Sequence, residues 1–173
     1  MEKGLTQVYW GDGKGKTTAA LGTALRAINN KYKIHLIQFL KKSPTSELQT
    51  LSNFYNFTFQ QFGTGELIKD IKKPSLSDVV KTEEAFQHLK YSLQKDYDII
   101  IADEILYAVQ FNLLKESDVI ALIKGKPQTV ELILTGSHKP FPNIFKHADL
   151  VTEIKKHKHP FDKGIQARKG IEY

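Results

Sequence analysis

Residues 11–18, Gly-Asp-Gly-Lys-Gly-Lys-Thr-Thr, have the types and spacing needed to hold a phosphate chain. Alternating glycines let backbone N–H groups turn towards an anion, and a following helix adds its N-terminal dipole. The ammonium of Lys16 can reach the outer phosphates, and the hydroxyl of Thr17 can ligate Mg²⁺. A strand before the motif and a helix after it argue against a glycine turn that merely caps a helix. The predicted nucleotide-binding residues are Gly11, Asp12, Gly13, Lys14, Gly15, Lys16, Thr17 and Thr18.

This loop departs from the usual pattern GxxxxGK[ST]. The Gly-Lys-Thr of residues 15–17 sets the register and would place the first glycine at position 10, but that residue is Trp10 and the glycine is Gly11. Lys14 is an additional cation within the loop. Trp10 either ends the first strand in the core or borders the bound nucleotide.

A pair of carboxylates, Asp103-Glu104, follows the continuous apolar run of residues 97–102. Such a run is typical of a central parallel strand that is buried on both faces. A carboxylate at its end holds Mg²⁺ directly or through water. Consecutive strand residues point to opposite sides, so at most one of the two binds the metal directly unless the strand has already ended. The alternative is one capping carboxylate and one solvated carboxylate.

Short apolar runs alternate with helical stretches along the chain. The predicted strands are residues 5–10, 33–40, 56–63, 97–104, 129–136 and 149–154. The predicted helices are residues 17–30, 43–54, 75–96, 116–126 and 140–148. This order predicts an α/β fold, a P-loop NTPase-like doubly wound, mostly parallel sheet with helices on both faces. The length of 173 residues favours a single domain, residues 1–173.

The three candidate features all follow predicted strands: the glycine loop, the Asp103-Glu104 pair and the turn at Thr135-Gly136. Ligands of doubly wound sheets bind at the C-terminal ends of the strands, so the fold brings these features to one edge. Together they predict binding of a magnesium–nucleotide complex. They do not decide between hydrolysis, phosphoryl transfer and another reaction.

The composition excludes several kinds of site and partner. There is no cysteine, which excludes disulfides, thiolate zinc sites and cysteine nucleophiles and fits a reducing, cytoplasmic setting. The N-terminus has no long apolar run, so neither a signal peptide nor a membrane partner is expected. The net charge of +6 comes from lysines spread along the chain, which favours a mildly basic surface over a nucleic-acid site.

The C-terminal stretch, residues 155–173, is basic and too polar for a core strand. One interpretation is a solvated charged tail. The other is a specified structure, with turns at Gly164 and Gly170 and with Ile165, Ile171 and Tyr173 as anchors. His157 and His159 lie two positions apart without thiols nearby, which is a weak pattern for a metal site.

Taken together, these motifs resemble the ATP:corrinoid adenosyltransferases of the CobA/BtuR/CobO type, also called cob(I)alamin adenosyltransferases. The resemblance runs in order over nearly the whole chain. It is carried by GDGKGKTTAALGTALRA, IQFLK, DIIIADEI, ILTGS, ADLVTEI and KHPFDKGIQARKGIEY. The glycine loop and the tail are far more specific than a generic phosphate loop.

The resemblance implies transfer of the 5′-deoxyadenosyl group of ATP to the cobalt of a reduced Co(I) corrinoid, with release of triphosphate, in adenosylcobalamin biosynthesis or salvage. Cobalt is the nucleophile, so no serine, cysteine or general base is needed. The implied catalytic residues are Lys16 and Glu104, and the implied magnesium ligands are Thr17 and Glu104, supported by Asp103. The resemblance also implies a homodimer and a protein that reduces the corrinoid.

Two features of many family members have no clear counterpart here. One is a helix before the first strand; this sequence begins about four residues before its predicted strand. The other is a Gly-Phe-Thr-Trp segment whose aromatic rings press on the lower face of the corrinoid. The matching stretch here, residues 62–71, has no aromatic residue after Gly65. Phe62, Leu67 and Ile68 are the candidates to replace it, and the corrinoid-binding residues stay unassigned.

Two other functions fit the motifs. A P-loop kinase or NTPase would direct a hydroxyl or water at the γ-phosphate. A binding module would hold ATP or a corrinoid without transfer, which the missing aromatic segment favours. Product analysis with ATP, magnesium and reduced cobalamin distinguishes the three.

Overall fold

The computed structural model describes residues 2–65 and 74–171. Its strands form one sheet in the order β3-β2-β4-β5-β1-β6, and every neighbouring pair is parallel. The strands are β1 (Thr6–Trp10), β2 (Ile34–Phe39), β3 (Phe57–Phe62), β4 (Ile99–Asp103), β5 (Glu131–Thr135) and β6 (Leu150–Glu153). The helices are α1 (Lys16–Ile28), α2 (Ser46–Leu51), α3 (Leu76–Ser92), α4 (Ile105–Gln110), α5 (Glu116–Gly125) and α6 (Pro142–Phe145), followed by the 3₁₀ turn η1 (Pro160–Lys163).

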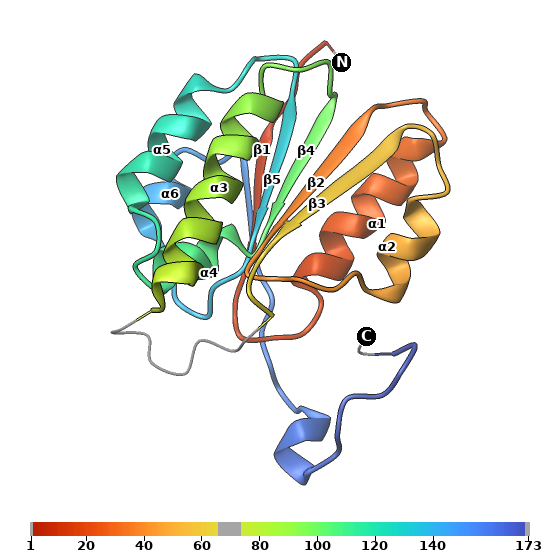
Figure 1. Ribbon diagram of the computed structural model, residues 1–173, viewed down its shortest axis with the longest axis vertical. Helices are drawn as coiled ribbons and strands as arrows, with labels where there is room; N and C mark the ends of the chain where they lie inside the picture. The colour runs from red at the N-terminus through yellow and green to blue at the C-terminus, as the bar shows by residue number, and fades with distance from the viewer. Residues whose placement is uncertain (1, 66–73, 172–173) are drawn as a thin grey trace.

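Helices cover both faces of the sheet, with α1 and α2 on one side and α3 to α6 on the other (Figure 1). Alternate strand residues supply a separate core to each face. Ile101 and Ile133 pack with α1 and α2, whereas Ile100 and Leu132 pack with the opposite helices. Strands β2, β4 and β5 are buried along their whole length, which explains their continuous apolar runs. The predicted α/β class is confirmed.

Two local features refine the sequence prediction. Helix α3 begins with a capping box, in which the Ser75 hydroxyl accepts a hydrogen bond from the Asp78 amide and the Asp78 carboxylate accepts one from the Ser75 amide. Helix α4 was not predicted, because its six residues continue an apolar run that reads as the end of a strand. This helix matters for the site because it starts directly after Glu104.

The glycine loop lies at the C-terminal edge of the sheet, where all six strands end (Figure 1). After β6 the chain leaves this edge as a tail, residues 155–171, which passes through η1 and returns towards α1 and α2 (Figure 1). Apart from the half-buried His159, the residues of the tail are exposed. The C-terminal edge therefore combines a buried part, made by strand ends, with an exposed part, made by the tail.

Candidate active site

The glycine loop is fastened to the ends of two strands. The Gly11 amide donates to the Ser137 carbonyl at 2.9 Å, and the Gly13 amide donates to the Ile154 carbonyl at 2.8 Å. Gly11 has a φ of 119°, and a Cβ atom there would lie 2.3 Å from the Ile154 oxygen. Only glycine fits this position, which accounts for the shifted glycine in the motif. These two amides hold the loop, so the amides left for phosphate lie further along it, towards α1.

Lys16 is curled beneath the loop. Its side chain is buried, and its Nζ donates to the carbonyls of Gly11 at 2.7 Å and Gly13 at 2.9 Å. Burial lowers the pKa of its ammonium, although the nearby carboxylates oppose this shift. The ring of Tyr107 from α4 lies 5.9 Å from the same Nζ. The ammonium is therefore held by neutral acceptors, which a phosphate can replace.

Asp103 is the most heavily bonded side chain of the site and is fully buried. Its Oδ1 accepts hydrogen bonds from the hydroxyls of Thr17 at 2.8 Å and Thr135 at 2.6 Å. Its Oδ2 accepts from Gln38 Nε2 at 2.9 Å and from Lys41 Nζ at 3.0 Å. The glycine loop, β2, β4 and β5 are thus joined at one carboxylate, as expected for neighbouring parallel strands.

Glu104 lies beyond the strand, since β4 ends at Asp103. Its φ of 66° is left-handed, which turns the chain sharply into α4. Its amide donates to the Thr135 hydroxyl at 3.0 Å, and its Oε1 lies 3.6 Å from Lys41 Nζ. Burial, and then the neighbouring Asp103 charge, raise its pKa to about 7. Both carboxylates therefore face the same ammonium, the outcome expected if the strand has already ended.

The residues brought together offer hard oxygen ligands of the kind Mg²⁺ prefers: the Thr17 hydroxyl and the carboxylates of Asp103 and Glu104. These are the three predicted metal ligands. Within residues 2–65 and 74–171, no cluster of three or more His, Cys, Asp or Glu side chains is arranged to hold a metal.

Sequence analysis gave no role to Gln38 and Lys41, although both belong to the IQFLK segment that carried the resemblance. Both bond to Asp103. A signal was present, since a glutamine inside an apolar strand and a lysine just past its end follow the same strand-end rule as Asp103.

The other charged residues of the loop contact the tail. Asp12 Oδ1 accepts a hydrogen bond from the Lys156 amide at 2.9 Å, and this bond lowers the pKa of the Asp12 carboxyl. Lys14 Nζ donates to the Ile171 carbonyl at 3.2 Å. Thr18 is exposed at the start of α1. The tail is thus connected near both its ends to the candidate phosphate loop.

Several predictions for the tail can be compared with the structure. The turns at Gly164 and Gly170 are confirmed, with left-handed φ values of 73° and 77°. The expected anchors Ile165 and Ile171 are wrong, since their side chains are largely exposed, and Tyr173 lies outside the described residues. The ring of His159 accepts a hydrogen bond from the Phe161 amide and so caps η1.

The aromatic residues near the loop have distinct surroundings. Trp10 ends β1, and its ring centroid lies 5.3 Å from that of Phe145 on α6. This supports the interpretation that Trp10 packs against the core. Phe62, one of the three candidates for the corrinoid face, is buried in the core cluster with residues of α3, and its ring centroid lies 5.4 Å from that of His88. Leu67 and Ile68, the other two candidates, lie outside the described residues.

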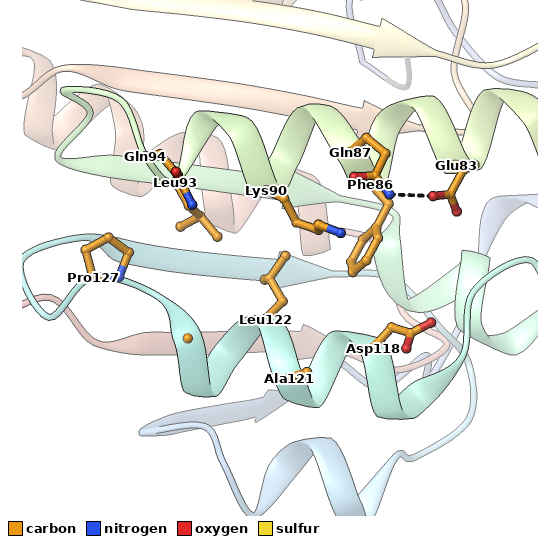
Figure 2. A pocket seen from close by; sticks show the side chains of 11 residues that line it. Glu83, Phe86, Gln87, Lys90, Leu93, Gln94, Asp118, Ala121, Leu122 and Pro127 are labelled. Atoms are coloured by element: carbon orange, nitrogen blue, oxygen red, sulfur yellow. Dashed lines mark hydrogen bonds between the residues drawn. The ribbon is translucent and has the colours of Figure 1, made fainter.

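Two cavities differ in their relation to these residues. A groove of about 650 Å³ between α3 and α5 (Figure 2) has Phe86 and Leu122 among its apolar residues and Glu83, Lys90 and Asp118 among its polar ones. No residue of the glycine loop or the acidic pair lines it. A second cavity, of about 500 Å³, lies between α1, α2 and the end of the tail. It borders the glycine loop and is of a size suited to small ligands.

No helix in the described ranges is both long and apolar enough to cross a membrane. The solved structures that resemble this one share its fold at low sequence identity. The cytoplasmic domain of EssC has a TM-score of 0.57 at 14% identity, over 96% of this chain and 34% of that one. FlaH from Methanocaldococcus jannaschii has a TM-score of 0.52 at 15% identity, over 88% of this chain and 72% of that one. These likenesses support the P-loop NTPase-like fold and nothing more specific.

Sequence comparisons are more specific. Residues 2–173 match the family model described as ATP:corrinoid adenosyltransferase BtuR/CobO/CobP. The corrinoid adenosyltransferase of Escherichia coli (strain K12) is 34% identical over 99% of this chain and 87% of its own length. The corrinoid adenosyltransferase CobA of Salmonella typhimurium is 33% identical over the same shares of the two chains. The chain therefore belongs to the ATP:corrinoid adenosyltransferase family.

Proposed function

We propose that this chain transfers the 5′-deoxyadenosyl group of ATP to the cobalt of a reduced corrinoid and releases triphosphate. The Co(I) electron pair attacks C5′, the C5′–O bond breaks, and its electrons leave on the triphosphate. The observation that supports this most directly is the family membership over residues 2–173. The arrangement at the C-terminal edge of the sheet agrees with it, because that edge gathers the ammonium groups of Lys14, Lys16 and Lys41 around the glycine loop and the acidic pair.

Leaving-group stabilisation is the main chemical task of such a site, since cobalt supplies the nucleophile. We assign this task to Lys16 and to the loop amides beyond Gly13. The Lys16 ammonium now bonds to two loop carbonyls, and a phosphate oxygen is a stronger, charged acceptor that can take their place. Lys14 and Thr18 border the same end of α1 and complete the proposed triphosphate site.

Magnesium is proposed as the metal bound with ATP, with Thr17 and Glu104 as its ligands and Asp103 in support. When bound, it would neutralise charge on the triphosphate. The chain's own part is to orient the ligands: Asp103 fixes the Thr17 hydroxyl at 2.8 Å, and the left-handed turn aims Glu104 at the same region.

The decisive experiment is product analysis. Incubation with ATP, Mg²⁺ and chemically reduced cobalamin should yield triphosphate and a cobalt–carbon product seen by its absorbance. ADP or phosphate instead would indicate a kinase or NTPase, and binding without turnover would indicate a binding module. If no adenosylated product forms with any reduced corrinoid tested, the proposed function fails.

The metal assignment has its own test. Glu104→Gln should raise the Mg²⁺ concentration needed for half-maximal activity by about tenfold, since one charged ligand is lost. Glu83→Gln, at an exposed glutamate of α3 that borders the groove away from the glycine loop, is the matched control and should leave the Mg²⁺ requirement unchanged. An unchanged requirement in Glu104→Gln would transfer the direct metal contact to Asp103.

Three further properties are proposed by resemblance to the family. The chain acts as one domain, residues 1–173, assembles as a homodimer, and receives its corrinoid reduced by a separate protein. Light scattering during size-exclusion chromatography measures the assembly. Activity with chemically reduced cobalamin but not with oxidised cobalamin would show that a separate reducing protein is required.

A further inference from the structure

The backbone around Lys41 is held by a close approach of two strand ends. The residue before it, Leu40, has a left-handed φ of 60°, and its amide donates to the Phe62 carbonyl at 2.8 Å. A Cβ atom on Gly63 would lie 2.5 Å from the Lys41 nitrogen. The start of the Lys41 side chain is therefore fixed relative to β2 and β3. The backbone of the two strand ends therefore sets the direction in which the Lys41 side chain leaves the chain.

The Lys41 ammonium is paired with both carboxylates of the acidic pair. Its Nζ lies 3.0 Å from Asp103 Oδ2 and 3.6 Å from Glu104 Oε1. The Lys41 side chain is 30% exposed, whereas that of Asp103 is fully buried and that of Glu104 is 19% exposed. The cation is thus the member of the group with most access to solvent. A movement of Lys41 outward would remove the ammonium from Asp103 Oδ2 and from Glu104 Oε1, while Thr17, Gln38 and Thr135 would keep their hydrogen bonds to Asp103.

Lys41 is the cation that directly contacts these acids. Among the ion pairs of the described residues, Lys41 is the partner of Asp103 and of Glu104. Lys16, the next cation, bonds instead to the carbonyls of Gly11 and Gly13. Two acidic side chains therefore share one ammonium, which occupies the oxygens that a divalent cation would need.

We infer that Lys41 is a resident counter-cation of the acidic pair, which keeps Mg²⁺ off Asp103 and Glu104 until ATP arrives. This inference rests on the proposed magnesium–ATP site. A dication and an ammonium repel one another at the same carboxylates. The triphosphate of ATP supplies new negative charge for the ammonium, so the metal and the nucleotide bind together. Lys41 is accordingly a positioning residue that couples metal binding to nucleotide binding.

The test measures metal affinity without ATP, using Mn²⁺ as the probe and its electron paramagnetic resonance signal as the readout. Lys41→Met removes the ammonium and keeps a similar side-chain volume. It should bind Mn²⁺ about tenfold more tightly than the wild type, a typical size for coupling between two bound groups. With ATP present this advantage should disappear. Lys41→Arg, which retains the cation, should stay as weak as the wild type.

Lys42→Met is the matched control, because it removes one positive charge from the next, exposed residue. Equal Mn²⁺ affinity of Lys41→Met and Lys42→Met without ATP would overturn the inference. If Lys41→Met is too unstable for titration, its unfolding temperature is followed instead, and Mn²⁺ should raise it more than that of the wild type. Adenosylation by the wild type without any divalent cation would contradict the metal assignment itself, a different failure from an unchanged Mn²⁺ affinity.

Discussion

Asp103 and the tail, residues 155–171, both lie at the C-terminal edge of the sheet, but they are held in different ways. Asp103 is fully buried and accepts hydrogen bonds from four side chains on three other segments of the body, which is the sheet with helices α1 to α6. The tail is almost wholly exposed, and it contacts the glycine loop through Asp12 and Lys14.

This difference indicates that the buried part and the tail contribute differently to stability and activity. The buried part is already organised before any ligand binds, because the strand ends that form it are fixed by the core. The tail buries too little apolar surface to be fixed in that way. Substitutions in the buried part should therefore alter both stability and activity. Substitutions in the tail should leave the stability of the body nearly unchanged.

The largest expected effect comes from Lys16→Ala. It removes the buried cation under the glycine loop, and kcat/KM for adenosylation should fall by about 10²–10³-fold. Lys124→Ala, at an exposed lysine of α5, is the control and should behave as the wild type. Kinetics of Lys16→Ala that match the control would refute the role assigned to this ammonium.

Asp103→Asn and Asp162→Asn compare the two regions directly, since each removes the charge of an aspartate paired with a lysine. Asp103→Asn leaves the Lys41 ammonium without its nearest partner, and the free energy of unfolding should fall by about 3 kcal/mol. Asp162 pairs with Lys156 in the exposed tail, so Asp162→Asn should cost less than about 1 kcal/mol. Urea denaturation measures both, and similar losses would remove the proposed distinction.

The same difference explains which features could be predicted from the sequence. The glycine loop, Asp103 and the succession of strands and helices along the chain follow from local patterns that the core enforces. The short helix α4 could not be predicted from a local pattern, because the left-handed turn at Glu104 interrupts an apolar run without a glycine or proline to mark it. Lys41 follows the same strand-end rule, but that rule does not distinguish it from a solvated surface lysine, because its carboxylate partners are distant in sequence.

The anchors expected in the tail were wrong for a related reason. Spacing of isoleucines and glycines can indicate turns, and the turns at Gly164 and Gly170 are present. Whether an apolar side chain is buried depends on a second surface that the sequence does not specify. Here Ile165 and Ile171 are largely exposed.

A buried histidine offers a pH test of the body alone. His35 of β2 contacts His88 of α3 at 2.8 Å, Thr58 of β3 at 2.8 Å and the ring of Tyr97, stacked at 4.9 Å. Burial and then the neighbouring His88 lower the pKa of His35 from 6.5 to about 4. The unfolded chain therefore binds a proton that the folded chain rejects between these values.

The contribution of neutral His35 to the free energy of unfolding is consequently fully present above about pH 6.5 and is lost as the pH falls towards 4. Between pH 7.5 and pH 5 the free energy of unfolding should decrease by about 2 kcal/mol from this residue. Urea denaturation at the two pH values should show a smaller decrease in His35→Leu than in His147→Leu, which alters an exposed histidine. Equal decreases in both variants would exclude His35 as the cause.

The smallest expected effect on stability comes from Asp12→Ala, which removes the bond between the Asp12 carboxylate and the Lys156 amide. The free energy of unfolding should stay at the wild-type value, because the carboxylate is exposed and the body does not depend on the tail. Trypsin cleavage after Lys156 and Lys158 should nevertheless become faster, since the start of the tail has lost a backbone restraint. Asp162→Ala is the control, because it breaks a side-chain pair of Lys156 and leaves the backbone bond intact. Faster cleavage in Asp12→Ala alone, without a change in unfolding, would establish that the glycine loop restrains the tail independently of the core.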